Sequence, residues 1–476
     1  MTLSREEMVA RLERGFNPRN VAVVGAARHN NFNWLRAHQA FQQKHGKLFH
    51  VNIDKNEWPG AEALGVPNFS SLLEIPEPID YVTISVPRQV VPRVVQDCIK
   101  KGVAVVHVYT AGFGESGEAE GIRLEQSIVE MAQKAGMPII GPNCLGVFNP
   151  AMGIRQGAGQ YHEEKGYLGY ISQSGSQSTG LVEEANSHGL KVSKCISMGN
   201  GVVVDAPDLV DYLAQDEDTK VIGMYLEGVR NPYKFFQSLR EAVKRKPVII
   251  WKVGQTEDAA RATEAHTGTR FVRRELWDAV VARCGALQVD SMDEMIDAAK
   301  ALSVVPTAIG VNIGLYALSG GHSTEMANVF SKHGFKVVPF SDRSHNELAS
   351  FLSLIGGNYV NPIQVGGENF DKVVDVLSRD ENIDVVAVEV STGRLHQDPK
   401  MLEGRIKAFK AFQASSTKPI IAVLSSLMPK TDSTTQETVE RRFSQEGIPA
   451  FLGFDRGARA LKNVVDYHSQ RVFLGE

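Results

Sequence analysis

The sequence predicts an α/β protein built from doubly wound parallel sheets, and three observations lead to this fold class. Short apolar runs alternate with amphipathic stretches along almost the whole chain, as expected when helices connect buried parallel strands. The chain has 476 residues, which at about 150 residues per domain suggests about three domains. A stretch of 25 residues recurs further along the chain, which indicates that two of these domains share one fold.

The composition excludes several other classes of protein. The 51 basic and 55 acidic residues give a net charge of −4, which argues against a polybasic nucleic-acid binder. No apolar run approaches the ~20 residues of a membrane helix, and the charged N-terminus lacks the apolar core of a signal peptide. The four cysteines form no CxxC pair, so we expect neither a zinc ribbon nor a disulfide scaffold. A reducing, cytoplasmic setting fits best, with no metal site, nucleic acid or membrane.

The first domain is expected to span residues 1–150. Its buried strands are predicted at residues 21–24, 81–86, 103–108 and 138–140, with helices over 89–101 and 118–135 between them. A turn of small residues, Gly25-Ala26-Ala27-Arg28, follows the first strand. It is not a full GxGxxG, so the dinucleotide fingerprint is weak, but it suits a nucleotide phosphate approached by the backbone.

Small or polar residues also follow the next strands of this domain. Asn52 and Lys55 follow one strand, Val86-Pro87 another, and Ala111-Gly112-Phe113 a third. Because ligands of open α/β sheets bind at the carboxyl ends of strands, these loops should line one crevice. Each loop taken by itself is an ordinary turn. Lys55 could contact a phosphate or could equally be a lysine exposed to solvent. Phe32 and Trp34 would either stack on an adenine base or pack in the protein interior, and we favour packing.

The remainder of the chain contains a duplication. Residues 168–192 align without gaps on residues 313–337, with nine of 25 positions identical. After an insertion, residues 211–221 match 375–385, and residues 246–250 match 418–422. We therefore expect two homologous domains, at about 166–305 and 306–476, after a linker at 153–166.

In each copy a strand ends in Ser-Gly and runs into a helix. At Ser174-Gly175-Ser176 the free backbone N–H groups and the helix dipole would form an anion site. The alternative is that Ser-Gly is only the tight turn between strand and helix.

His266 and Glu227 are the strongest candidates for catalytic residues. His266 lies between the predicted strand 248–253 and a helix-like stretch at 271–282, so we expect it on a loop. An imidazole can act as a nucleophile and carry a covalent intermediate, and Glu227, at a strand end, could orient it. The alternatives are an exposed loop histidine and a plain strand-end carboxylate. The third domain has Ser391-Thr392 where the second has Glu227-Gly228, and it has no His-Thr-Gly, so we expect only one copy to carry the pair.

Taken together, these pieces resemble a known family. The chain is similar to the α subunit of the nucleoside-diphosphate-forming acyl-CoA synthetases, such as acetate–CoA ligase (ADP-forming), and more distantly to the succinyl-CoA synthetase α subunit. The matching segments cover essentially the whole chain in the family's order: residues 24–28, 111–113, 141–146, 171–175, 197–200, 225–228 and 265–268.

The resemblance implies a fold and a set of site residues. The fold would be a Rossmann-like CoA-binding domain followed by two homologous flavodoxin-like domains of the succinyl-CoA-synthetase type. His266 would become phosphorylated and Glu227 would steady it, while Ser174, Gly175, Ser176 and Gly268 would hold the phosphoryl group. The implied CoA-binding residues are Gly25, Ala26, Ala27, Arg28, Asn52, Lys55, Val86, Pro87, Ala111, Gly112, Phe113, Asn143 and Cys144.

The resemblance also implies a reaction and a partner. An acid, CoA and ATP would interconvert with acyl-CoA, ADP and phosphate through an acyl phosphate and a phosphohistidine. Three α/β domains account for this chain and it has no P-loop, so ATP/ADP and Mg²⁺ would sit on a separate ATP-grasp β subunit in an α2β2 assembly. The substrate would be a small carboxylic acid. Residues 269–274, which follow the histidine, and 29–34 depart from the family's pattern.

Two other functions are compatible with parts of the sequence. The first is a catalytically silent CoA-binding or regulatory protein on the same scaffold, against which the retention of both His266 and Glu227 argues. The second is an NAD-dependent dehydrogenase, which the missing GxGxxG disfavours.

Overall fold

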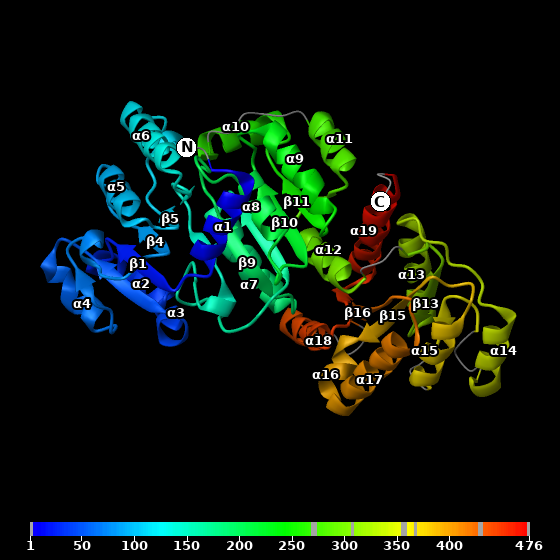
Figure 1. Ribbon diagram of the computed structural model, residues 1–476. Helices are drawn as coiled ribbons and strands as arrows, with labels where there is room; N and C mark the ends of the chain where they lie inside the picture. The colour runs from blue at the N-terminus through cyan, green and yellow to red at the C-terminus, as the bar shows by residue number, and fades with distance from the viewer. Residues whose placement is uncertain are drawn as a thin grey trace. The chain divides into compact units, whose positions relative to one another are not determined.

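The computed structural model describes residues 3–267, 274–305, 309–353, 359–365, 369–426 and 432–473. It forms two compact units, described separately here (Figure 1). The first unit is Met1–Glu184 with Lys191–Asp290, and the second is Ala185–Leu190 with Ser291–Glu476. The three domains with boundaries at 1–150, 166–305 and 306–476 stay a prediction.

The first sheet of unit 1 is parallel and has the strand order β3-β2-β1-β4-β5-β6. Its order reverses between β1 and β4, as in dinucleotide-binding folds, and the point of reversal opens a crevice at the strands' carboxyl ends. The four predicted strands are present as β1, β4, β5 and β6, with ends that differ by one or two residues from the prediction. The strands of the sheet are β1 (Asn20–Val24), β2 (Lys47–Val51), β3 (Asn68–Phe69), β4 (Tyr81–Ile84), β5 (Val105–Val108) and β6 (Ile139–Ile140).

Helices cover this sheet because each carries one apolar face. Val91, Val94, Val95 and Cys98 of α5 are buried, and α5 packs on β4 and β5. Figure 1 shows α5 and α6 to one side of the sheet and α1 and α3 to the other. The helices are α1 (Arg5–Phe16), α2 (Asn33–Ala37), α3 (Gln39–Lys44), α4 (Trp58–Glu62), α5 (Val91–Lys101) and α6 (Ala119–Ala135), with 3-10 turns η1 (Arg28–Asn30), η2 (Lys55–Glu57), η3 (Leu72–Glu74), η4 (Gly114–Ser116) and η5 (Pro150–Met152).

The second sheet of unit 1 has the order β12-β11-β10-β8-β9-β7. All pairings are parallel except that of β7 with β9. Without β7, the order is that of flavodoxin-like sheets. The strands are β7 (Gly146–Phe148), β8 (Leu168–Ser172), β9 (Val192–Ser197), β10 (Val221–Leu226), β11 (Val248–Lys252) and β12 (Leu287–Val289); the helices are α7 (Gly175–Ser187), α8 (Ala206–Leu213), α9 (Pro232–Val243), α10 (Glu257–Thr267) and α11 (Arg274–Cys284).

Two loops join the sheets of unit 1 closely. Gly199 has φ +53°, and a Cβ there would lie 2.3 Å from the carbonyl oxygen of Asn143, so the two backbones touch only because residue 199 is glycine. Asn200 donates its side-chain amide to Glu115 Oε2 at 2.6 Å and to Glu125 Oε2 at 3.0 Å. The carboxyl edges of both sheets are thereby tied together.

The segment predicted as a linker, residues 153–166, forms no helix or strand but is docked on the first unit. Arg155 is buried and donates to the backbone carbonyls of Ala37 and Gln160, at 3.0 and 3.1 Å. A buried guanidinium needs such acceptors, so the segment is a fixed part of unit 1.

The third sheet, in unit 2, repeats the flavodoxin-like order as β14-β13-β15-β16-β17, with parallel pairings. Helices α7 and α13 occupy equivalent positions of the repeat and have 13 residues each, so the duplication seen in the sequence is confirmed in the topology. The elements are β13 (Ile313–Ala317), β14 (Ile363–Gln364), β15 (Val385–Ser391), β16 (Ile420–Ser425), β17 (Ala450–Leu452), α12 (Met292–Val304), α13 (Gly320–Lys332), α14 (Asp342–Phe351), α15 (Phe370–Arg379), α16 (Thr392–Gln397), α17 (Pro399–Ser415), α18 (Ser433–Gln445) and α19 (Phe454–Phe473).

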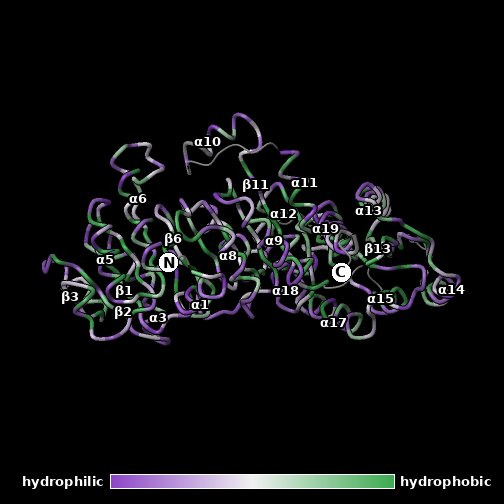
Figure 2. The backbone as a smooth tube through the Cα atoms, turned by 45° about the horizontal axis from the view of Figure 1, so that its top comes forward, coloured by the Kyte–Doolittle hydropathy of each residue, from purple (hydrophilic) through white to green (hydrophobic). Residues whose placement is uncertain are grey.

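The strands form the core of each unit. Residues of β8, β10, β13 and β15 are buried along their whole length, as expected for parallel strands covered on both faces. Figure 2 shows the hydrophobic stretches concentrated in the strands and hydrophilic residues along outer helices such as α10. Within the described ranges, no helix is both long enough and apolar enough to span a bilayer.

Candidate active site

A cavity of about 960 Å³ opens at the carboxyl edge of the first sheet, where the strand order reverses. Its volume falls in the usual range for small-molecule sites. The loops after β1, β2, β4 and β5 all contribute to it, as the sequence predicts. Six of the predicted CoA-binding residues line it: Gly25, Ala27, Asn52, Val86, Pro87 and Ala111.

Gly25 allows two loops that line this cavity to touch each other. Its φ is +90°, and a Cβ there would lie 2.4 Å from the carbonyl oxygen of Ser85. The turn after β1 and the loop after β4 therefore lie against one another at the cavity floor, which only glycine permits.

Seven other predicted CoA-binding residues do not line this cavity. Phe113 and Cys144 are buried in the core, and Ala26 uses its carbonyl to accept from His50 and Asn52. The Arg28 guanidinium is turned toward η2, where it donates to the carbonyl of Asn56. The remaining three are Lys55, Gly112 and Asn143.

The aromatic pair after the first turn packs inside, as favoured from the sequence. Phe32 and Trp34 are buried, and Phe32 fills the space beside Gly60. They therefore do not offer a stacking surface to a base.

Sequence reasoning missed several residues of the cavity. Ile53 is 86% exposed and Tyr109 44% exposed, and both line it. Large apolar side chains exposed at a cavity mouth indicate a surface that a ligand covers. Their positions just after the ends of β2 and β5 could have predicted that they line the cavity.

The second sheet brings His266 and Glu227 together. His266 Nδ1 lies 2.9 Å from Glu227 Oε1 and 3.0 Å from Oε2. The Glu227 side chain is 2% exposed and that of His266 is 51% exposed. The carboxylate is thus inside the protein, and the imidazole stands over it at the surface.

This geometry fixes the chemistry available to the imidazole. An ionised carboxylate only accepts hydrogen bonds, so the ring proton sits on Nδ1 and Nε2 keeps its lone pair. A partly exposed Nε2 with a lone pair is a nucleophile, and a buried carboxylate stabilises the cation that forms when Nε2 is substituted.

The predicted loop position of His266 is wrong, because the residue lies in the last turn of α10 (Glu257–Thr267). The helix begins with Glu257 and Asp258, which favour a helix N-terminus, and continues with residues of high helix propensity. The helix presents the histidine from a fixed direction.

Two side chains hold the backbone of Glu227 in place. Gln173 Oε1 accepts from the N–H groups of Glu227 and, at 2.9 Å, Gly228. Lys252 Nζ donates to the Glu227 carbonyl at 2.8 Å. Burial lowers the pKa of Lys252 to about 8, although the nearby charge of Glu227 opposes this. The three residues come from the ends of adjacent strands β8, β10 and β11.

The Ser-Gly turn lies at the same edge. Ser174 accepts from Gln177 N–H at 3.5 Å, and its hydroxyl lies 3.1 Å from that of Ser176. At Gly175, the first residue of α7, a Cβ would lie 3.1 Å from the Leu145 side chain, so Leu145 packs directly against the start of this helix. Because β8 and β10 are neighbours, the start of α7 and Glu227 share one edge of the sheet. Gly268 lies outside the described residues.

Helix α10 also lies beside η4, which follows the loop of Ala111 at the first cavity. The cavity of the first sheet and the histidine of the second are therefore on the same side of unit 1. Cys144 lies between the sheets, and burial raises the pKa of its thiol to about 12, which removes it as a thiolate nucleophile.

The third sheet holds a histidine–glutamate pair that the sequence did not predict. The second copy has no pair at the positions of His266 and Glu227, but His322 Nδ1 lies 2.5 Å from Glu389 Oε1. The pair was missed because neither residue aligns with His266 or Glu227. His322 aligns with Gln177, and Glu389 with Tyr225.

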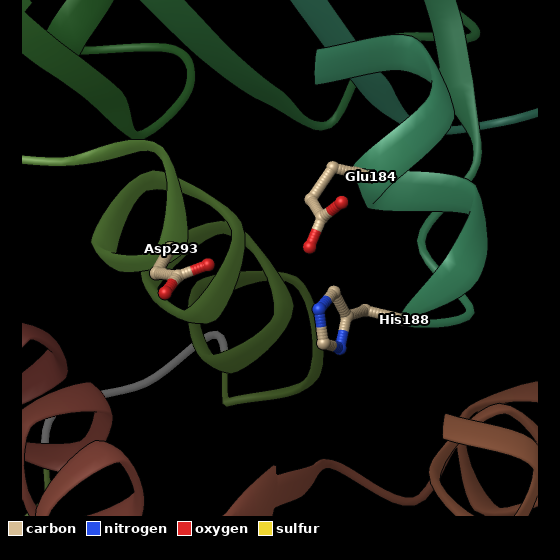
Figure 3. A group of neighbouring side chains, drawn as sticks. All are labelled: Glu184, His188 and Asp293. Atoms are coloured by element: carbon tan, nitrogen blue, oxygen red, sulfur yellow. The ribbon is translucent and has the colours of Figure 1, made fainter. Parts of the chain in front are cut away.

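Figure 3 shows another group of polar side chains, with His188 and Asp293 in unit 2 and Glu184 one turn before His188 on α7. His188 Nδ1 lies 2.6 Å from Glu440 Oε2, and Glu440 also accepts from Lys300 at 2.5 Å. Burial is the largest single effect on the pKa of His188 and lowers it, but the hydrogen bond to Glu440 and the charge of that carboxylate together outweigh burial and raise that pKa. The imidazole is committed to an ion network, so we assign no metal to it.

Comparison with known proteins agrees with this geometry. Residues 19–150 match the family described as CoA binding domain, and residues 165–302 match the succinyl-CoA ligase like flavodoxin domain. Subunit alpha of acetate–CoA ligase (ADP-forming) II from Pyrococcus furiosus is 32% identical over 452 residues, which cover 92% of this chain and 94% of that one. The chain belongs to the family of ADP-forming acyl-CoA synthetase α subunits.

Other members of the family are similar over much of the chain. Subunit alpha of acetate–CoA ligase (ADP-forming) I from Pyrococcus furiosus is 30% identical and covers 94% of this chain. Acetate–CoA ligase (ADP-forming) I of Archaeoglobus fulgidus is 33% identical, but the match spans only 54% of that longer protein. A solved structure of the dinucleotide-forming acetyl-coenzyme A synthetase 1 of Ca. Korarchaeum cryptofilum, in complex with phosphate and ADP, aligns with a TM-score of 0.84 at 25% identity and covers 98% of both chains.

Proposed function

We propose that this chain is the α subunit of an acid–CoA ligase that forms ADP, with His266 as its phosphoryl carrier. The observation that carries the proposal is the contact of His266 Nδ1 with the buried carboxylate of Glu227. The relatives are ligases, which favours this function over a catalytically silent CoA-binding protein on the same scaffold.

CoA would bind in the cavity of the first sheet. Ile53 and Val90 offer apolar surface to the adenine, and the bare backbone at Gly25 allows a phosphate to approach closely. Because α10 lies beside η4, the thiol end would point toward the edge that carries His266.

On this chain the reaction would proceed in two transfers, after which His266 would pass the phosphoryl group to ADP on the partner subunit. Phosphate attacks the thioester carbonyl of acyl-CoA, the C–S bond breaks, and CoA leaves as an acyl phosphate forms. His266 Nε2 then attacks the phosphorus, the P–O bond to the acyl group breaks, and the carboxylic acid leaves as its carboxylate. The substituted imidazole keeps its proton on Nδ1 and is positively charged, which the carboxylate of Glu227 balances.

Ser174, Gly175 and Ser176 would hold the transferring phosphoryl group, with Gly268 as a further candidate. The backbone N–H groups at the start of α7 point out of the helix, and the helix dipole favours a negative group there.

A separate β subunit of the ATP-grasp type would supply the nucleotide site and Mg²⁺, in an α2β2 assembly in the cytoplasm. The names of the relatives, which are α subunits, support a partner for this chain. His266 is partly exposed at the end of a helix, as required of a carrier that must reach a second site.

The proposal is tested by purifying the chain alone and together with its ATP-grasp partner. We expect ATP-dependent CoA-thioester formation from a small carboxylic acid only with both subunits, and a screen of acids would identify the substrate. His266→Asn should abolish this activity, whereas His333→Asn should retain it, because His333 is bound to Asp455 in the other unit. Full activity of the single chain, or of His266→Asn, would contradict the proposal.

A further inference from the structure

A second imidazole of the chain is held as His266 is. His322 lies in the first turn of α13, and its Nδ1 is 2.5 Å from Glu389 Oε1. The His322 side chain is 26% exposed, and that of Glu389 is fully buried. As in the first pair, a buried carboxylate at the carboxyl end of a central strand contacts the Nδ1 of a partly exposed imidazole.

Glu389 is fixed on several sides. Its Oε2 accepts from the backbone N–H of Leu318 at 2.8 Å, and its Oε1 accepts from the hydroxyl of Ser425 at 2.7 Å. A fully buried carboxylate with three hydrogen-bond donors cannot turn away from the imidazole without leaving its donors unsatisfied. Phe454 packs edge-on against the His322 ring, with centroids 5.4 Å apart, and fixes its plane.

The other ring nitrogen, Nε2, has no hydrogen-bond partner among the residues that the structure describes, and the side chain is 26% exposed. Gly321 precedes His322 directly, and a Cβ there would meet nothing within 4 Å, so the first turn of α13 is uncovered at Gly321. The first turn of a 13-residue helix adds a favourable potential for a negative group.

Other described histidines differ in one of these respects. The imidazole of His188 also contacts a glutamate, but its side chain is buried. His50 has partners at both ring nitrogens, and the Nε2 of His333 is bound to Asp455. His322 therefore shares its combination of features with His266 rather than with a structural histidine.

We propose that His322 is a second phosphoryl-accepting residue of this chain, with an acyl phosphate as the donor. The lone pair of Nε2 attacks phosphorus, the P–O bond to the acyl group breaks, and the carboxylate leaves with both electrons of that bond. The proton stays on Nδ1, and the positive charge of the phosphorylated ring is balanced by Glu389. That the enzyme itself generates this donor rests on the proposed function, but acceptance by His322 does not.

The pair is not an inherited copy of the first one. His322 occurs where the second sheet has Gln177, and Glu389 where it has Tyr225. The same arrangement of imidazole and carboxylate has thus been built from different positions of the repeat, the histidine here coming from the helix after the first strand rather than from a helix after the fourth.

The test is labelling of the full chain, alone and with its partner subunit, by ³²P-acetyl phosphate. We expect acid-labile, alkali-stable label at two histidines, so that His266→Asn and His322→Asn each lose about half of it and the double variant loses all. Glu389→Gln should lower the label at His322, whereas His333→Asn should change nothing. Tandem mass spectrometry of the wild-type chain locates the phosphoryl group without any substitution.

Each outcome separates this inference from the proposed function. Label on the peptide that contains His322 supports the inference, even if His266 carries none, which would then refute the proposed role of His266. Loss of all label in His266→Asn, or a wild-type peptide at His322 without phosphate, overturns it. A chain that takes up no label at either histidine overturns both.

Discussion

Replacing Glu227 by glutamine separates the charge of this residue from its shape. The Glu227 side chain is 2% exposed and touches His266 Nδ1 with both oxygens, at 2.9 and 3.0 Å. Glutamine fills the same volume, but it carries no charge and can turn its NH₂ group toward the imidazole. The phosphorylated ring would then lose its counter-charge, and the neutral ring would lose the acceptor that keeps its proton on Nδ1.

The size of the effect follows from the contact that is lost. Hydrogen bonds to charged groups contribute about 1.5–3 kcal/mol, and each 1.4 kcal/mol of transition-state stabilisation is about tenfold in rate. Phosphorylation of His266 in Glu227→Gln should therefore be about 10- to 150-fold slower than in the wild type. Because the acyl phosphate is bound elsewhere, its KM should change less than kcat.

The assay is the rate of acid-labile ³²P incorporation at His266, measured with the complex of both subunits. Glu257→Gln is the matched control, since it removes one exposed carboxylate from the same helix, α10, without touching His266. We expect the control to label at the wild-type rate. Equal rates for Glu227→Gln and the wild type would refute the assigned role of the carboxylate.

Four further predictions concern the surroundings of the site. Gln173→Leu leaves two N–H groups without an acceptor and should lower the free energy of unfolding, measured in urea, by about 1–3 kcal/mol for each. The pKa of Lys252 is lowered to about 8 by burial, so between that pH and about 10.4 the unfolded chain binds more protons. Over this range the wild type should gain stability relative to Lys252→Met, by up to roughly 3 kcal/mol; parallel unfolding curves would contradict this. Gly25→Ala should weaken CoA binding in calorimetry by about tenfold or more through its contact with the loop after β4, whereas Gly65→Ala, also at positive φ but 4.0 Å from its nearest neighbour, should not. Cys144→Ala should retain ligase activity, since burial raises the pKa of the thiol to about 12; loss of activity with an intact fold would show that the thiol matters.

The fold could be predicted to a large extent because its signals are local. Apolar runs such as Val21–Val24, or Val105–Val108 with its single histidine, indicate buried parallel strands, and the internal repeat indicates that two sheets share one topology. The position of His266 could not be predicted in the same way. The three residues before His266 contain no glycine or proline that would end a helix, and α10 continues through them.

The location of the crevice in the first sheet was predicted correctly, but only some of the residues that line it were predicted. The carboxyl ends of strands meet at one edge whatever their sequence, so Gly25, Asn52 and Ala111 were found. Which side chains turn into the cavity depends on neighbours far along the chain. Arg28 turns away because the carbonyl of Asn56 accepts a hydrogen bond from its guanidinium, which also forms an ion pair with Glu57.

The sequence by itself determined the class of the sheets, the duplication and the motifs that mark the family, because periodicity and motif spacing are properties of neighbouring residues. Only the tertiary structure decided which side chains meet. Glu227 reaches His266 because β10 and β11 are adjacent strands, and Glu389 reaches His322 because α13 starts beside β15. The second pair lies 67 residues apart in the chain, at positions that do not align with the first. A pair of this kind becomes visible only when a parallel sheet brings distant strand ends to one edge.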